Sequence, residues 1–217
     1  MKIKTTFLLL FLIITLTSCE KKEFEFSCDP RINKHVKENK KSFAGISLDE
    51  LNSYDISLQR AIFNSWDPAK KRSAWVEKLN SILSNEELNY YEQEHLSKLV
   101  DHISSDYFSE ANLNNKPASH TDFAREWISI AITDLQWKED YIAYIVYRLY
   151  TNSEQFYQEI SEINDLNKSI TTDTETYNCN CNTSSDFCNT GACSSGDCNF
   201  TGGCGWLWSM VCNGTCY

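Results

Sequence analysis

The sequence contains little proline or glycine outside its C-terminus, and few basic residues. Only 3 of its 217 residues are proline and 7 are glycine. Between residues 45 and 165 these are Gly45, Pro68 and Pro117 alone. So few chain-breaking residues exclude a long linker there and favour an ordered domain. The 20 basic residues against 30 acidic ones give a net charge of −10. Because nucleic-acid binding requires basic residues to neutralise phosphates, nucleic acid is not an expected partner.

The motifs of the common enzyme classes are also absent. The sequence has no His-Glu-x-x-His, no Gly-x-Ser-x-Gly, no phosphate-binding loop and no dinucleotide-binding glycine motif. Its four histidines, among them His95 and His102, form no metal-ligand spacing, and we expect them at the surface. We therefore predict no catalytic residue, no metal and no cofactor, and a protein that is not an enzyme.

A short apolar run at the N-terminus indicates export. Two lysines precede the run from Phe7 to Ile14, which is too short to span a bilayer comfortably, so residues 1–18 are typical of a signal peptide. Leu16-Thr17-Ser18-Cys19 then resembles the lipobox of bacterial lipoproteins. This resemblance implies a lipid on Cys19, cleavage before it, and an envelope location at the outer membrane or cell surface. The alternative is a secreted protein with a chance cysteine after its signal.

Eight of the ten cysteines fall between residues 179 and 216, a segment without lysine, arginine or histidine. No Cys-x-x-Cys pair occurs among them, which disfavours a zinc site, and export favours disulfides. A segment of about 40 residues buries too little apolar surface to fold without such staples. We predict that all eight are in disulfides and that Cys179 does not pair with Cys181, but the sequence does not choose the pairing. The eight are Cys179, Cys181, Cys188, Cys193, Cys198, Cys204, Cys212 and Cys216.

The chain divides into five segments by composition. After the signal we expect a polar, lysine-rich tether at 19–45, in which Cys28 is left over and is either free or bridged to a partner. Residues 46–166 have helical apolar spacing and predict an all-α domain of five to seven helices. A threonine-rich linker at 167–177 follows, and then a cysteine-rich domain at 178–217. The predicted fold class is an all-α helical domain plus a small disulfide-rich C-terminal domain.

Local signals place several of the helix ends. The segments from Ser47 to Glu50 and from Ser84 to Glu87 both match the capping box that begins a helix. Asp67 followed by Pro68 predicts another start. The segment 112–120, which contains Pro117, is the longest expected loop within the helical domain.

The cysteine-rich segment resembles the fulvocin C-related bacteriocins over residues 178–217. At its start the resemblance lies in Cys179-Asn180-Cys181, a threonine and serine run, and Asp186-Phe187-Cys188. At its end it lies in Thr201 to Trp206, Cys212 to Gly214 and Tyr217. The helical segment resembles the larger members in Leu58 to Phe63, Trp66-Asp67-Pro68, Lys70-Lys71, Trp75 and Glu77 to Leu79. The resemblance implies a non-enzymatic precursor whose tail is toxic to related bacteria.

Two functions are consistent with these features. The first is an anchored bacteriocin-like precursor whose tail is freed and secreted by a protease cutting in 167–177, or acts by contact on a target-cell envelope component. In this case Trp206 and Trp208 are the expected target or membrane contacts. The second is a cell-envelope lipoprotein whose helical domain and stapled tail form a non-enzymatic binding module. The two tryptophans can equally be a small core beneath the bridges.

Overall fold

We describe a computed structural model of the chain, which covers residues 25–114, 117–169, 181–188 and 192–216. The signal peptide, Cys19 and Cys179 lie outside these ranges, so the assignments made for them stay predictions. Within the described residues the chain forms nine helices, a two-stranded sheet and a short 3₁₀ turn. The helices are α1 Pro30–Phe43, α2 Leu48–Leu51, α3 Ile56–Ser65, α4 Pro68–Asn85, α5 Tyr90–His102, α6 Glu110–Asn114, α7 Ala118–Thr133, α8 Glu139–Tyr147 and α9 Ser153–Ser169.

The helix starts follow local capping chemistry, although one predicted start is wrong. Ser47 accepts a hydrogen bond from the Glu50 N–H at 3.1 Å and begins α2. Asp67 accepts from the Lys70 N–H at 2.8 Å and begins α4 at Pro68. Ser84, however, lies inside α4, which continues to Asn85. The next helix begins instead after Asn89, with a complete capping box.

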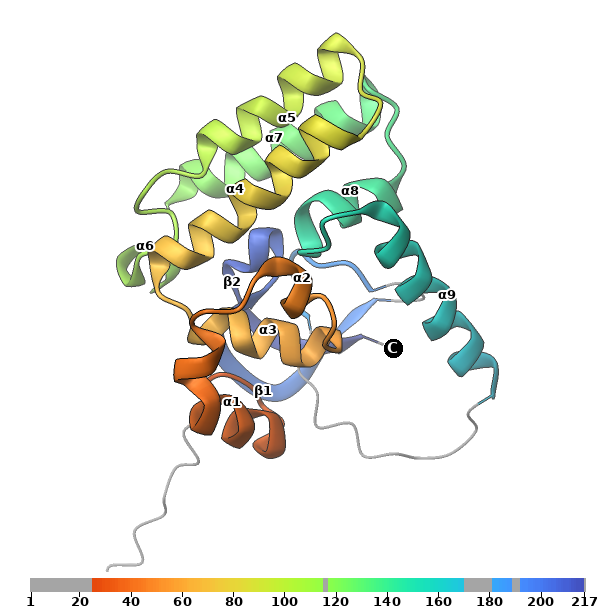
Figure 1. Ribbon diagram of the computed structural model, residues 1–217. Helices are drawn as coiled ribbons and strands as arrows, with labels where there is room; N and C mark the ends of the chain where they lie inside the picture. The colour runs from red at the N-terminus through yellow and green to blue at the C-terminus, as the bar shows by residue number, and fades with distance from the viewer. Residues whose placement is uncertain (1–24, 115–116, 170–180, 189–191, 217) are drawn as a thin grey trace, which may run out of the picture.

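The tail forms an antiparallel hairpin of β1 (Cys193–Cys204) and β2 (Met210–Cys216), joined through the 3₁₀ turn η1 (Trp206–Trp208). Figure 1 shows α4, α5 and α7 together in one group and α1, α2 and α3 in another, with the blue tail between them. β1 contacts α3 and α6, and η1 contacts α8. The tail therefore lies against α3, α6 and α8.

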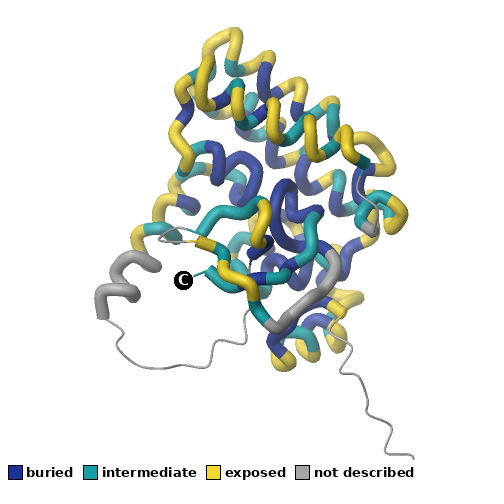
Figure 2. Tube along the Cα trace, turned by 180° about the vertical axis from the view of Figure 1, so that it is seen from behind, coloured by how far each residue is buried: buried dark blue, intermediate teal, exposed yellow. Residues whose placement is uncertain are grey.

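One hydrophobic core runs through the helices and into the tail. It contains Val36 and Phe43 from α1, Trp75 and Leu79 from α4, and most of α8. Trp206, Leu207 and Trp208 belong to the same cluster. Figure 2 shows buried segments concentrated in the interior of the trace and exposed ones along its outer helices. The expected fold class, helices plus a small disulfide-rich tail, is confirmed, but the tail shares the core of the helices.

Three expectations about the segments between and around the helices are wrong. Residues 30–43 are helical, and Val36 and Phe43 are buried, so 19–45 is not a free tether throughout. α9 continues to Ser169, into the segment expected as a linker. The loop expected at 112–120 is shorter, because α6 ends at Asn114 and α7 begins at Ala118.

Candidate functional site: the tail against the helical domain

Three disulfides are described in the tail, and each joins two tail cysteines. They are Cys181–Cys193, Cys188–Cys216 and Cys204–Cys212. Six of the eight predicted disulfide cysteines are thus paired, and Cys181 pairs with a residue other than Cys179. The sulfurs of Cys181, Cys188 and Cys193 lie within 4.8 Å of one another, but all three are oxidised and offer no thiolate to a metal.

Cys28 is part of a disulfide, so the expectation that it is left over is wrong. It lies just before α1 and is buried in one cluster with Cys204 and Cys212. Asp29, next to it, caps α1 by accepting from the Arg31 N–H at 2.7 Å. The segment that enters the first helix therefore packs directly on the tail hairpin.

The connection between the two strands holds the bulkiest side chains of the tail. We call Gly205–Ser209 the tryptophan turn. Gly205 has φ +65°, and Leu207 and Trp208 both have φ +51°. Left-handed backbone at bulky residues costs about 1–3 kcal/mol each and persists only where the surroundings fix it. The surroundings here are the helical core.

Trp208 is fully buried between helices of the helical domain. Its ring meets the Phe63 ring edge-on at 5.4 Å and the Trp75 ring at 6.0 Å. Its indole N–H donates to the Tyr147 carbonyl at 2.9 Å, at the end of α8. Trp206 packs edge-on against Trp127 of α7 at 5.5 Å. The turn thus contacts α3, α4, α7 and α8 at once.

In the folded chain Trp206 and Trp208 are covered, so their expected contact with a target or membrane stays a prediction for a freed tail. Their exposed fractions are 1% and 0%. The alternative of a small core beneath the bridges is also incomplete, because their neighbours are helical residues. The sequence signal was the bulky run Trp206-Leu207-Trp208 in an otherwise small and polar tail, and nothing in that run specified which surface covers it.

A buried ion pair joins the tail to α3. The Arg60 guanidinium lies 3.1 Å from the Asp186 carboxylate, with side-chain exposures of 4% and 0%. Asp186 also accepts from the backbone N–H groups of Asn182 at 3.0 Å and Gly205 at 2.8 Å. Burial lowers the pKa of Arg60, and the charge of Asp186 opposes that effect. Because Asp186 bonds to both the turn and α3, it fixes the orientation of the tail on the helices.

Two weaker polar contacts extend this interface. The hydroxyl groups of Tyr147 and Ser185 lie 3.0 Å apart. The Asn64 side-chain amide donates to the Gly202 carbonyl at 3.2 Å. Sequence reasoning identified none of Arg60, Asn64 and Asp186, since each partner lies more than a hundred residues away along the chain.

The carbonyl groups at the C-terminal end of α8 bind both a buried lysine and the tail. The buried Lys78 ammonium donates to the carbonyls of Tyr144, Ile145 and Arg148, which a helix end leaves without intrahelical partners. Burial holds the pKa of Lys78 well below its usual value. Arg148 pairs with Glu159 of α9 at 3.0 Å. The Tyr147 carbonyl then accepts the Trp208 indole N–H.

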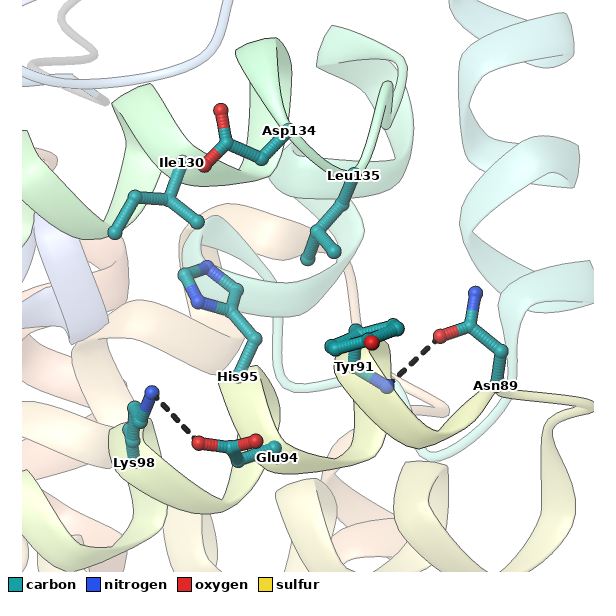
Figure 3. A pocket seen from close by; sticks show the side chains of 8 residues that line it. All are labelled: Asn89, Tyr91, Glu94, His95, Lys98, Ile130, Asp134 and Leu135. Atoms are coloured by element: carbon teal, nitrogen blue, oxygen red, sulfur yellow. Dashed lines mark hydrogen bonds and ion pairs between the residues drawn. The ribbon is translucent and has the colours of Figure 1, made fainter.

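A separate pocket of about 490 Å³ opens between α5 and the end of α7, away from the tail. Tyr91, Glu94, His95 and Lys98 line it from α5, and Ile130 and Asp134 line it from the opposite side (Figure 3). His95 is only 5% exposed, so the expectation of a surface position for it is wrong.

Comparison with protein-family models, with curated proteins and with solved structures found no match to this chain. Among the described residues, no helix combines the length and the apolar composition needed to cross a bilayer.

Proposed function

We propose that the chain is an exported, non-enzymatic binding protein of the cell envelope whose helices and stapled tail act as one folded unit. The observation that carries this proposal is the burial of Trp206, Leu207 and Trp208 in the helical core. A tail meant to work on its own is expected to keep its apolar side chains for its target. Here those side chains complete the core of the protein that carries them.

Separation of the tail carries a large energetic penalty. Fully burying a large apolar side chain contributes about 1.5–3 kcal/mol, so the three residues of the turn contribute about 5–9 kcal/mol. Separation also leaves Arg60 or Asp186 without its buried partner. Cutting the backbone before the tail therefore does not by itself free it.

Export and anchoring are supported by the signal-like N-terminus, the lipobox-like Cys19 and the oxidised cysteines. Disulfides form and persist outside the cytosol, and three of them are described in the tail. We propose that a lipid on Cys19 holds the protein at the membrane, and that the helical unit meets other envelope components. The absence of catalytic motifs from the sequence supports binding rather than catalysis.

An antibacterial tail is the second candidate. It is favoured by the resemblance of residues 178–217 to fulvocin C-related bacteriocins, and by the three described bridges, which all connect tail to tail. A peptide carrying its own staples is suited to survive outside the parent chain. In the intact protein such a tail is latent, because its tryptophans are covered by helices.

One experiment separates the two candidates. A recognition site for a specific protease is placed within residues 170–177 of a Cys28→Ser variant, so that the bridge of Cys28 cannot hold the pieces together. The purified oxidised protein is then cut and run on a sizing column without denaturant. We expect the cut tail to elute with the helices and the mixture not to kill related bacteria. Release of the tail under these native conditions, together with killing by the released fraction, would overturn the binding proposal in favour of the bacteriocin. The uncut protein is the control.

A further inference from the structure

The pocket between α5 and the end of α7 contains a fixed hydrogen-bond acceptor. The His95 ring stacks on Trp127 at 4.5 Å, and its Nε2 lies 3.0 Å from the Trp127 carbonyl. A carbonyl only accepts, so Nε2 carries the proton and donates. In return, the Trp127 indole N–H donates to the His95 carbonyl at 3.1 Å. These reciprocal bonds lock the ring and leave Nδ1 as a lone-pair acceptor.

Nothing in the described part of the chain hydrogen-bonds to this Nδ1 atom, although the side chain is almost fully buried. Burial also lowers the pKa of His95, which keeps the ring neutral at ordinary pH. Nδ1 is not among the fully enclosed side-chain atoms that lack a partner, so it is reached from the pocket and is not sealed in the core. The residue therefore acts as a positioned acceptor in the wall of a pocket.

An aromatic platform stands at the rim of the same pocket. Tyr91 is 71% exposed, and its backbone N–H is held by the Asn89 side chain at 2.9 Å (Figure 3). The Tyr91 ring meets the Tyr90 ring edge-on at 5.6 Å and presents a solvent-facing aromatic surface at the pocket. The neighbouring Tyr90 is equally exposed, at 72%, but does not line the pocket.

The charges around the pocket exclude several ligand classes. Lys98 and Glu94 pair at 3.0 Å and largely neutralise each other, which leaves Asp134 as the unpaired charge. With the carboxylates of Glu94 and Asp134 against the single Lys98 ammonium, the pocket carries a net negative charge, which disfavours an anionic ligand. Within the described residues, one cluster of histidine, cysteine or acidic side chains has the spacing of metal ligands. It consists of the disulfide cysteines Cys181, Cys188 and Cys193, which lie outside this pocket. The pocket is not a metal site.

We propose that this pocket binds a neutral saccharide of one or two rings. Sugar hydroxyls can donate to His95 Nδ1 and to the Asp134 carboxylate and can accept from Lys98, while a sugar's C–H face can lie on the Tyr91 ring. The volume of about 490 Å³ is in the range of small-ligand sites. This inference rests on the proposed binding function and names the substrate class as envelope glycan.

Titration calorimetry of the full oxidised protein tests the proposal, with the β-1,4-linked dimer of N-acetylglucosamine and with cellobiose as probes. We expect saturable binding of at least one of them. Tyr91→Ala should weaken it by about tenfold or more, because the aromatic platform is lost. Tyr90→Ala, an equally exposed tyrosine on the same helix, should change affinity by less than about threefold.

His95→Gln tests the acceptor. Glutamine retains an N–H donor for the Trp127 carbonyl but loses the ring stacking and the fixed Nδ1 lone pair. Binding should therefore fall while the variant stays folded at the temperature of the titration. No binding of either probe, or equal losses from Tyr90→Ala and Tyr91→Ala, would overturn the saccharide site. The outcome is independent of the protease experiment, since a released tail leaves α5 and α7 in the chain and sugar binding can be measured in either case.

Discussion

At the scale of single residues, Asp186 determines how the tail sits on the helices. One carboxylate bonds to the Arg60 guanidinium, to the Asn182 N–H and to the Gly205 N–H. These bonds connect α3, the start of the tail and the tryptophan turn. An ionised carboxylate in such surroundings is tolerated only because both of its oxygens accept hydrogen bonds.

Removing the positive partner should therefore be costly. We expect Arg60→Met to lower the free energy of unfolding by about 3–5 kcal/mol, because the Asp186 carboxylate loses its buried counter-charge. The matched control is Arg31→Met. This change breaks an ion pair of 3.0 Å with Asp29, but the Arg31 side chain is 92% exposed. Its loss should be much smaller, because an exposed ion pair is screened by solvent. Urea titration measures both, and equal losses would contradict the role given to Asp186.

The role of a residue could be predicted from the sequence where its hydrogen-bond partner lies close along the chain. The sequence alone placed the caps at Ser47 and Asp67, because each cap bonds to a backbone N–H three residues away. Arg60 and Asp186 are separated by 126 positions. No local pattern links them, so only the fold reveals the pair.

At the scale of elements, the tryptophan turn depends on the bridge at its base. Cys204 and Cys212 close a loop of 8 positions around Gly205–Ser209. Gly205 has φ +65°, and an added Cβ there would meet the Ser185 carbonyl oxygen at 2.7 Å. The turn is thus fixed by a covalent link, by a glycine and by its contacts with the helices.

Replacing Cys204 and Cys212 together by alanine should lower the free energy of unfolding by about 2–3 kcal/mol, the value expected for a loop of this length. It should also shift tryptophan emission to longer wavelength, because the Trp206 and Trp208 side chains become more exposed to water. The control replaces Cys188 and Cys216, a bridge of separation 28 outside the turn. That pair should cost about 3–4 kcal/mol yet leave the emission of the folded state unchanged. A red shift in the control alone would contradict the account.

Element boundaries were predictable only in part. The apolar spacing of residues 46–166 correctly indicated helices there, and α3, α4, α5, α7 and α8 each bury apolar residues. The start predicted at Ser84 failed because its hydroxyl donates to the Asn80 carbonyl within α4, while Asn89 and Glu92 satisfy both halves of a capping box. α1 was missed because its many lysines mask the few apolar residues that it buries.

At the scale of the whole molecule, one core joins segments from Phe26 to Trp208. The sequence indicated a helical part and a stapled part, and both are present. It did not indicate that they share a core, because apolar periodicity gives the face that is buried and not the surface that covers it. Because the covering surface could not be predicted, Trp206 and Trp208 were expected to contact a target or a membrane.

A shared core rich in tyrosine predicts a steep loss of stability in alkali. Burial raises the pKa values of Tyr107, Tyr144, Tyr147 and Tyr150 above the usual 10.0. Groups with a higher pKa in the folded chain contribute stability that is fully present below pH 10 and is lost as pH rises through the folded values. Lys71, whose pKa burial lowers to about 8, has the opposite sign and adds stability from about pH 8 to its usual 10.5.

Thermal melts across the alkaline range measure the balance. We expect the melting temperature to rise from pH 8, to peak near pH 10, and then to fall as the tyrosines outweigh Lys71 and Lys78. Tyrosinate absorbance from the buried rings should appear together with unfolding. If most tyrosines ionised near their usual pKa of 10.0 while the chain stayed folded, the result would contradict the burial of these four rings in the core.

The central claim, that the tail and helices form one folded unit, is tested most directly by native-state hydrogen exchange. In the tail, the N–H groups of Gly205, Trp208 and Ser209 are hydrogen-bonded to Asp186, Gly205 and Trp206 respectively. We predict that these three amides exchange as slowly as the core amides of α8, because both require global unfolding. Exchange of the three that is orders of magnitude faster, while α8 stays protected, would show a tail that opens by itself and would contradict the account.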